Sequence, residues 1–233
     1  MNQVIITGAS TGIGSETARL LLQADWQVTN LSRRPCPVDG VHNIGCDLSS
    51  PPAIDAVLPQ LREQVQQSDR TLLIHNASLL RNDRADATSN SDFAEVLQIN
   101  LAAPNTLNAA LLPLLRPGSA VIYVGSTLSE KAVANSYSYV TTKHATIGMM
   151  RATCQDLAGR GVHTACVCPG FTDTEMLRSH IGTDPDTEAA VASMSAFGRL
   201  IQPLEIAETI VWAGLHPVIN GAVLHANLGQ LER

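Results

Sequence analysis

Hydrophobic and polar positions follow two patterns along the chain. Short continuous apolar runs predict strands that are buried on both faces, and apolar residues spaced three and four apart predict amphipathic helices. The predicted strands are residues 4–6, 28–31, 71–75, 120–124, 162–167 and 222–226. The predicted helices are residues 15–24, a segment around 54–61 with a kink near Pro59, and residues 92–115, 137–158 and 204–215. This alternation predicts an α/β fold, a doubly wound parallel sheet of the Rossmann type.

One segment departs from the alternation. Residues 173–202 are polar and acidic at their start and carry scattered apolar side chains such as Met176 and Leu177. A chain of 233 residues is long enough for one substantial domain. We therefore expect a single dinucleotide-binding domain over residues 1–233, with a mobile substrate lid, containing a short helix, at residues 173–202.

Composition excludes several classes of protein. With 45% hydrophobic and 15% charged residues the chain is not disordered, and a net charge of -6 disfavours nucleic acid as a partner. No apolar stretch has the length of a membrane span or a signal peptide, so we expect no membrane partner and a cytoplasmic location. The scattered cysteines include no CxxC pair, which agrees with that location. Cys166 and Cys168 share a strand face near His163, but two buried apolar thiols are favoured there over a metal site.

The glycine-rich stretch Thr7–Gly14 lies between the first predicted strand and the first predicted helix. Glycine allows a tight turn and a close approach of the backbone to a ligand, and a helix N-terminus offers free N–H groups to a pyrophosphate. The alternative is a plain strand-to-helix turn, which three glycines in this position disfavour. The predicted cofactor residues here are Gly8, Ser10, Thr11, Gly12, Ile13 and Gly14.

A proton-transfer group follows further along the chain. Tyr139 and Lys143 stand at i and i+4 of a predicted helix, and an ammonium favours the phenolate form of a neighbouring tyrosine. Ser126 follows the strand 120–124, at the edge where ligands of open parallel sheets bind. An isolated Tyr/Lys pair would usually be a surface contact, but the glycine loop and Ser126 change that balance. Tyr137 is a weaker candidate, because position 141 holds no lysine.

Together these motifs resemble the short-chain dehydrogenase/reductase family, in its compact single-domain branch and closest to the 3-oxoacyl-carrier-protein reductase type. The resemblance covers nearly the whole chain. It rests on Thr7–Gly14, Asp47-Leu48, His75-Asn76-Ala77-Ser78, Asn100, Ser126, Tyr139 with Lys143, and Pro169-Gly170. Two departures are Ser78, where the family usually has glycine, and the tail 226–229, where many relatives read Val-Asp-Gly-Gly.

The resemblance implies roles for further residues. Lys143 would also bind the nicotinamide ribose, and Asn100 would support a water-linked proton relay to the lysine. Without the resemblance, Asn100 would be a polar residue satisfied within its helix. The remaining cofactor contacts implied are Asp47, Leu48, Asn76, Ala77, Ser78, Pro169 and Gly170, with Thr172 and Thr174 near the carboxamide. For Asp47 the alternative is a cap of the helix that starts near Pro51.

The second strand distinguishes between the two nicotinamide dinucleotides. NAD sites usually place a carboxylate after this strand to bind the ribose 2′-hydroxyl. This chain has Ser32-Arg33-Arg34 instead, with no carboxylate before Asp39. Guanidinium groups bind a 2′-phosphate in bidentate fashion, so we predict NADP(H). The alternative is a pair of solvated surface arginines.

The predicted function is an NADP(H)-dependent oxidoreductase that interconverts a small-molecule ketone or aldehyde and its alcohol, with Tyr139 as general acid/base. The alternative is a non-catalytic NADP(H)-sensing protein of the same fold. An extended-branch epimerase or dehydratase is disfavoured, because such chains are longer and space their glycines differently.

A homo-oligomer, a tetramer or else a dimer, is implied by the resemblance. Two long predicted helices carry apolar residues on more than one face. A second apolar face needs a partner chain, unless all of these residues pack inside the monomer. The residues concerned are Leu107, Leu111, Leu114, Ile147, Met149 and Met150.

Overall fold

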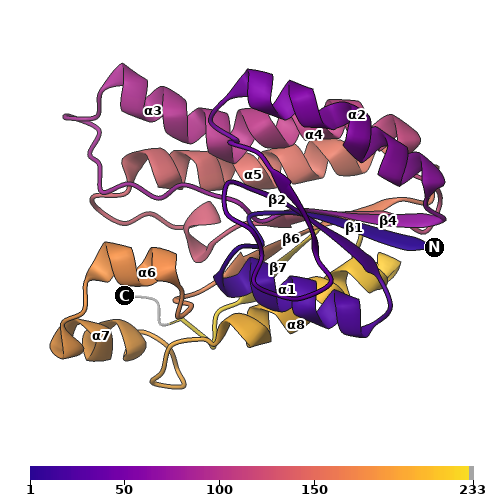
Figure 1. Cartoon of the computed structure of the whole chain (residues 1–233). Coiled ribbons are helices and arrows are strands. Elements are labelled where there is room, and N and C mark those ends of the chain that lie inside the picture. The colour runs from indigo at the N-terminus through magenta and orange to yellow at the C-terminus, as the bar shows by residue number, and fades with distance from the viewer. Residues whose placement is uncertain (231–233) are drawn as a thin grey trace.

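The chain folds around one sheet of seven parallel strands. Figure 1 shows the computed structural model, in which residues 1–230 are described. The strands are β1 (Asn2–Thr7), β2 (Gln27–Ser32), β3 (His42–Gly45), β4 (Arg70–His75), β5 (Ala120–Val124), β6 (His163–Pro169) and β7 (Ala222–Ala226). Their order across the sheet is β3-β2-β1-β4-β5-β6-β7. The chain therefore winds in both directions from β1, as the alternation of strands and helices predicts.

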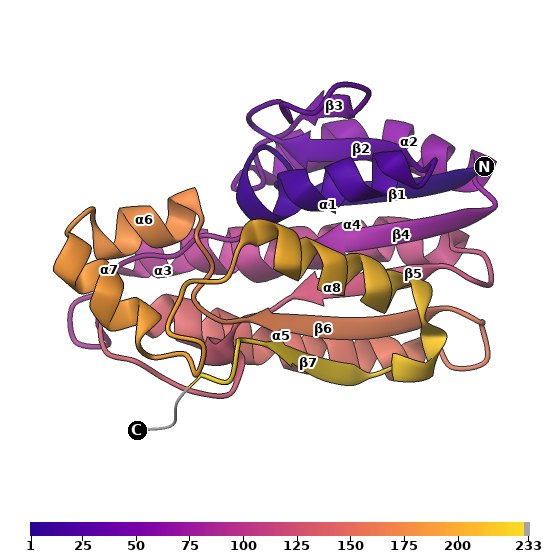
Figure 2. The ribbon, with the colours of Figure 1, turned by 90° about the horizontal axis from the view of Figure 1, so that it is seen from below.

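Helices cover both faces of the sheet. They are α1 (Gly12–Gln23), α2 (Pro51–Gln67), α3 (Asn90–Leu97), α4 (Ala103–Leu111), α5 (Tyr137–Asp156), α6 (Glu175–Ile181), α7 (Pro185–Ala192) and α8 (Pro203–Leu215). Helices α2, α4 and α5 lie on one face, and α1 and α8 on the other (Figures 1 and 2). Alternate side chains of a strand enter opposite cores, so Ile5 packs on the first face and Val4 and Ile6 on the second.

The predicted long helix over residues 92–115 is not uniform. It consists of α3, a π-helical turn over Gln98–Ala102, α4, and a 3₁₀ turn over Leu112–Leu114. A π turn adds a residue without interrupting the helix, and such turns occur frequently at functional sites. The helix α2, by contrast, continues through Pro59 over its full 17 residues.

The segment 173–202 holds two short helices rather than the one expected. The N-cap of helix α6 is Thr174, whose hydroxyl accepts a hydrogen bond from the Leu177 N–H, and the N-cap of α7 is Asp184, whose carboxylate accepts from the Thr187 N–H. The two ends of the segment meet, because the Ile201 N–H donates to the Phe171 carbonyl (2.9 Å). The segment therefore leaves the sheet edge and returns to it at one place.

The structure shows where Cys166 and Cys168 lie and whether any described helix is suited to cross a membrane. The sulfur atoms of Cys166 and Cys168 lie 3.8 Å apart in one core, while the His163 ring bonds the Ala213 carbonyl on the opposite face. Within residues 1–230 no cluster of side chains suited to a metal is present. None of the described helices combines the length and apolar character that a membrane span needs.

The apolar residues that suggested a partner for the long helices pack inside the monomer. Leu107, Leu111 and Met150 are fully buried, and Ile147 is 5% exposed. Leu114 and Met149 are half-buried against the same core. The monomer itself therefore covers four of these six residues, while Leu114 and Met149 stay partly exposed, and the homo-oligomer stays a prediction.

Candidate active site

The glycine-rich loop lies where β1 and β4 end side by side, which is the point at which the winding of the sheet reverses direction. The Thr7 hydroxyl accepts hydrogen bonds from the backbone N–H groups of Asn76 and Ala77 (both 3.0 Å). The Asn76 amide in turn donates to the carbonyls of Thr7 (3.0 Å) and Gly8 (2.9 Å). The structure thus brings together the predicted cofactor residues that follow these two strands.

The loop is shaped for glycine at its closest contacts. A β carbon on Gly14 would lie 2.4 Å from the Gly8 carbonyl oxygen and 2.7 Å from Asn76 Nδ2, so no side chain fits there. Gly8 has a φ of +73°, which glycine adopts without strain. The N-cap of α1, Thr11, makes no side-chain capping bond, which leaves the first N–H groups of the helix for an anion. This cradle fits a dinucleotide pyrophosphate.

Other predicted cofactor residues lie around this loop. Ser10 and Ser32 place their hydroxyl oxygens 3.4 Å apart, and Ile13 packs against the core. Ser78 is half-buried, and its hydroxyl has no hydrogen-bond partner among the described residues. Leu48 is 7% exposed, so its side chain belongs to the core rather than to an open site.

The residues after β6 lie at the base of the lid. The Gly170 N–H donates to the Ala226 carbonyl (3.0 Å), and the Thr172 hydroxyl donates to the Gly170 carbonyl (3.1 Å). Thr174 instead extends to the phosphate loop, where its Cγ2 lies 3.1 Å from the position of a β carbon on Gly12. The Thr174 hydroxyl accepts from the Leu177 N–H, so its O–H is left to donate, whereas the Thr172 hydroxyl already donates and keeps only its acceptor capacity.

The charged residues after β2 and β3 form a small network. Asp47 accepts hydrogen bonds from the Ser49 N–H (3.0 Å) and hydroxyl (2.8 Å), which hold its pKa below the usual range, with a smaller contribution from Arg33. The cap of α2 is Ser50, so Asp47 is not the helix cap considered above. Arg33 is exposed, and Arg34 forms a bidentate pair with Glu175 of the lid.

Tyr139 and Lys143 are both buried on one face of α5, at 8% and 4% exposure. The Lys143 ammonium lies 5.3 Å from the centre of the Tyr139 ring and donates to the Val124 carbonyl at the end of β5 (2.8 Å). An ammonium has three N–H donors, so two remain for a ligand within reach of this edge. The pair is therefore held by the sheet and is not a surface contact of the helix.

Asn100 connects the π turn to the helix that carries this pair. Its side-chain oxygen accepts from the Leu79 N–H (2.7 Å), and its amide donates to the Leu79 carbonyl (3.0 Å) and to the Thr142 hydroxyl (2.9 Å). Thr142 stands between Tyr139 and Lys143 on α5. Asn100 thus lies beside the predicted proton-transfer group, and the side chain that links it there, Thr142, was not predicted from the sequence.

Ser126 begins a short 3₁₀ turn directly after β5. Its hydroxyl oxygen accepts from the Leu128 N–H (3.1 Å), and its own N–H donates to the Ser129 hydroxyl (3.1 Å). Since the hydroxyl oxygen accepts that bond, the O–H of Ser126 is left to donate to a ligand. The turn fixes the backbone of a residue that is half-buried.

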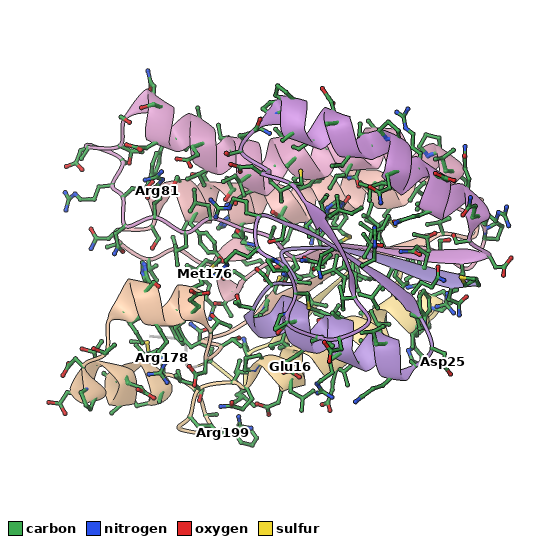
Figure 3. All side chains as sticks on the ribbon, in the orientation of Figure 1. Glu16, Asp25, Arg81, Met176, Arg178 and Arg199 are labelled. Carbon is green, nitrogen blue, oxygen red and sulfur yellow. The ribbon has the colours of Figure 1, made fainter. Side chains whose placement is uncertain are left out.

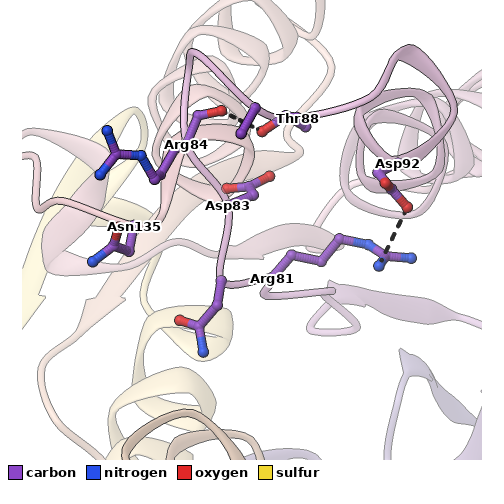
Figure 4. Close-up of a pocket in the computed structure, with 8 residues that line it drawn as sticks. Arg81, Asp83, Arg84, Thr88, Asp92 and Asn135 are labelled. Atoms are coloured by element: carbon purple, nitrogen blue, oxygen red, sulfur yellow. Dashed lines mark hydrogen bonds and ion pairs between the residues drawn. The ribbon is translucent and has the colours of Figure 1, made fainter.

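A cavity of about 560 Å³ opens beside the start of α5 (Figure 4). It is lined by Arg81, Asn82, Asp83, Arg84, Ala87, Thr88, Asp92 and Asn135. Asp83 connects it to the helix, because its carboxylate accepts from the Ser138 N–H (3.1 Å), one residue before Tyr139. The cavity is polar and contains none of the four predicted catalytic residues.

Comparison with known proteins identifies the class. A model of the family described as short chain dehydrogenase matches residues 2–184. The 3-oxoacyl-[acyl-carrier-protein] reductase FabG of Vibrio cholerae serotype O1 is 26% identical, with 97% of this chain and 96% of the relative covered. Carbonyl reductase family member 4 of Xenopus laevis is 27% identical, over 94% of this chain and 93% of the relative.

A solved structure agrees with these relatives. A short chain dehydrogenase family protein from Francisella tularensis subsp. tularensis superposes with a TM-score of 0.88 at 25% identity, and 97% of each chain is covered. The chain belongs to the short-chain dehydrogenase/reductase family. It is an oxidoreductase of that family, similar to 3-oxoacyl-carrier-protein reductases, and the cofactor class of the family is a nicotinamide dinucleotide.

Proposed function

We propose that this chain is an NADP(H)-dependent reductase of a small-molecule ketone or aldehyde, with Tyr139 as the proton donor. The observation that carries the proposal is the burial of Lys143 beside the Tyr139 ring, with its ammonium anchored to the end of β5. A bound reduced nicotinamide supplies the hydride. The relatives named above, which reduce 3-oxoacyl groups or carbonyls by their names, support a carbonyl substrate.

The residues of the chain divide the remaining work. The free O–H of Ser126 holds the substrate oxygen, and Tyr139 donates its proton to that oxygen as negative charge develops there. Lys143 stabilises the resulting phenolate by its positive charge. Asn100 and Thr142 position the helix that carries both groups, and a water-linked relay through this region would return the proton to the tyrosine.

The cofactor preference follows from charge. The stretch after β2 offers two exposed guanidinium groups, Arg33 and Arg34, and no carboxylate on the same stretch before Asp39. A 2′-phosphate suits such groups, while a ribose 2′-hydroxyl would need an acceptor there. Arg33→Ala with Arg34→Ala should therefore weaken NADPH binding about 10- to 100-fold and leave NADH binding nearly unchanged. Equal losses for the two cofactors would mean that the arginines do not bind the phosphate.

A panel of ketones and aldehydes, followed at the NADPH absorbance band, tests the activity itself. We expect substrate-dependent oxidation of NADPH by the wild-type chain and a preference for carbonyls over other electrophiles. Tight NADPH binding with no turnover across a broad panel would favour the cofactor-sensing alternative instead.

We also propose that the chain forms a homo-oligomer, most simply a tetramer. Support comes from the outer edge of the sheet, where β7 has no neighbour among the described strands. Trp212 on α8 is 45% exposed and Val218 is 87% exposed nearby, which is unusual for large apolar side chains. Light scattering at micromolar concentration is the test, and a mass near the 24.8 kDa of one chain would refute the proposal.

A further inference from the structure

Arg34 is engaged by the lid, although its predicted ligand belongs to the cofactor. Two guanidinium nitrogens of Arg34 contact the two carboxylate oxygens of Glu175, at 2.7 and 3.2 Å. The residues are 141 positions apart in sequence, so the pair joins the end of β2 to the first turn of α6. The neighbouring Arg33 lies closer to the charge of Asp47, which it helps to keep ionised.

The start of α6 also contacts the phosphate loop. Arg34 is the main cause, and the Thr11 hydroxyl a minor one, of a Glu175 pKa held below its usual range. Thr11 is the N-cap of α1, and the neighbouring Thr174 packs against Gly12. Glu175 is therefore ionised at neutral pH and lies between the predicted pyrophosphate site and the predicted 2′-phosphate ligand.

We propose that Glu175 competes with the 2′-phosphate of NADP(H) for Arg34, and that it thereby sets how strongly this chain prefers NADP(H) over NAD(H). The inference rests on the proposed cofactor site. A guanidinium presents its paired donors to one bidentate partner at a time, so the lid carboxylate and the phosphate exclude each other on the same face of Arg34. NAD(H) carries no 2′-phosphate and leaves the pair intact.

The pair is suited to being exchanged. Its two side chains are 58% and 57% exposed, and exposed ion pairs contribute little to stability. A phosphate brings more negative charge than a carboxylate and three acceptor oxygens, so it displaces Glu175 at low cost. The negative charge of Glu175 still opposes the phosphate, which is why its removal should strengthen NADP(H) binding. The start of α6 would then be released from β2 when NADP(H) binds, but not when NAD(H) binds.

The experiment is a calorimetric titration of NADPH, NADH, adenosine 2′,5′-bisphosphate and 5′-AMP into the full chain and its Glu175→Gln variant. We expect Glu175→Gln to tighten NADPH and the bisphosphate about three- to tenfold, with NADH and 5′-AMP changed by less than about twofold. The two adenosine probes reach only that end of the site, so they report on the contact without requiring activity.

Glu188→Gln is the matched control. Glu188 is a lid carboxylate that pairs with Arg178 instead of Arg34. Its removal should leave the NADPH-to-NADH affinity ratio unchanged, and unfolding temperatures of both variants verify the fold. Two results would overturn this inference and leave the proposed function standing, provided that the wild type binds NADPH tightly. One is an NADPH-to-NADH affinity ratio in Glu175→Gln equal to that of the wild type, and the other is weaker NADPH binding in that variant. Failure of the wild type to bind either dinucleotide would instead refute the proposed function.

Discussion

The carboxyl edge of the sheet and the lid are held by different kinds of interaction. At the edge, Lys143 and Asn100 are buried, and they donate hydrogen bonds to the Val124 carbonyl and the buried Thr142 hydroxyl. In the lid, α6 has no buried residue and α7 has one, Val191. The lid is connected instead by ion pairs near the surface, among them those of Arg178, which Figure 3 shows at the lid helices.

These two kinds of interaction predict which part of the site moves. Breaking a buried hydrogen bond leaves a polar group without water, whereas an exposed ion pair exchanges its partner for solvent. We therefore expect the edge to keep the predicted proton-transfer residues in one geometry, and the lid to open and close at small cost. Four variants test this contrast, beginning with the one that should have the largest effect.

Tyr139→Phe tests the chemistry of the edge. Removal of the hydroxyl should lower kcat about 10²- to 10⁴-fold, because the proton donor is lost, while NADPH binding is retained. Tyr137→Phe is the matched control, since Tyr137 is 42% exposed and stacks on Phe93 at 5.6 Å between ring centres. It should change kcat less than about twofold. Wild-type turnover in Tyr139→Phe would exclude the proposed mechanism.

Asn100→Ala tests the framework behind that chemistry. It removes three hydrogen bonds and leaves the Leu79 N–H unpaired, so we expect a loss of about 3 kcal/mol in the free energy of unfolding. Asn105→Ala, at an exposed position of α4, is the control and should stay within about 0.5 kcal/mol of wild type. Chemical denaturation measures both. Equal stability of the two variants would show that the edge is not held in this way.

His75 adds a pH dependence that belongs to the buried edge. Burial lowers the pKa of His75 to about 4, and its ring bonds the Asn108 amide oxygen at 2.8 Å. In the unfolded chain the histidine has a pKa of about 6.5, so below that pH it binds a proton that the buried, neutral ring of the folded chain does not bind. The contribution of neutral His75 to the free energy of unfolding is therefore fully present above about pH 6.5 and is lost as pH falls towards 4.

Between pH 7.5 and 5 the contribution of His75 should amount to about 2 kcal/mol of unfolding free energy. His163, whose pKa burial also lowers, adds to the loss with the same sign. His75→Gln should flatten the dependence, and His42→Gln, at an exposed strand position, should not. Denaturation curves at the two pH values measure this dependence. If the unfolding free energy of His75→Gln changed with pH as much as that of the wild type, His75 would not be its source.

Much of the fold follows from the sequence, because buried parallel strands and helices differ in their apolar period and here alternate regularly. The pairing of Tyr139 with Lys143 also follows, since an i, i+4 spacing places both on one helix face. The role of Asn100 came from the family resemblance alone. The π turn adds only one residue to a helix that otherwise continues, so the broad apolar period of residues 92–115 did not reveal it.

The lid shows where sequence reasoning ends. Its second helix had a local signal, Asp184 followed by Pro185, but lacks the apolar face that periodicity detects. Apolar positions on the long helices suggested a partner that the monomer itself supplies, because the pattern does not tell which surface covers a side chain. The contact of Glu175 with Arg34 joins residues 141 positions apart, and only the folded chain brings them together.

Arg178→Ala tests the other side of the comparison and should have the smallest effect. Arg178 bonds Asp173 at the base of the lid (2.8 Å) and Glu188 on α7 (3.0 Å), so it connects the two lid helices. Its loss should speed amide hydrogen exchange about two- to fivefold within residues 173–202 and leave β4 and β5 unchanged. Arg19→Ala is the matched control, because Arg19 forms a similarly exposed pair with Glu16 within α1. If amide exchange in β4 and β5 changed together with that of the lid in Arg178→Ala, the two regions would form one cooperative unit, and the contrast between them would be wrong.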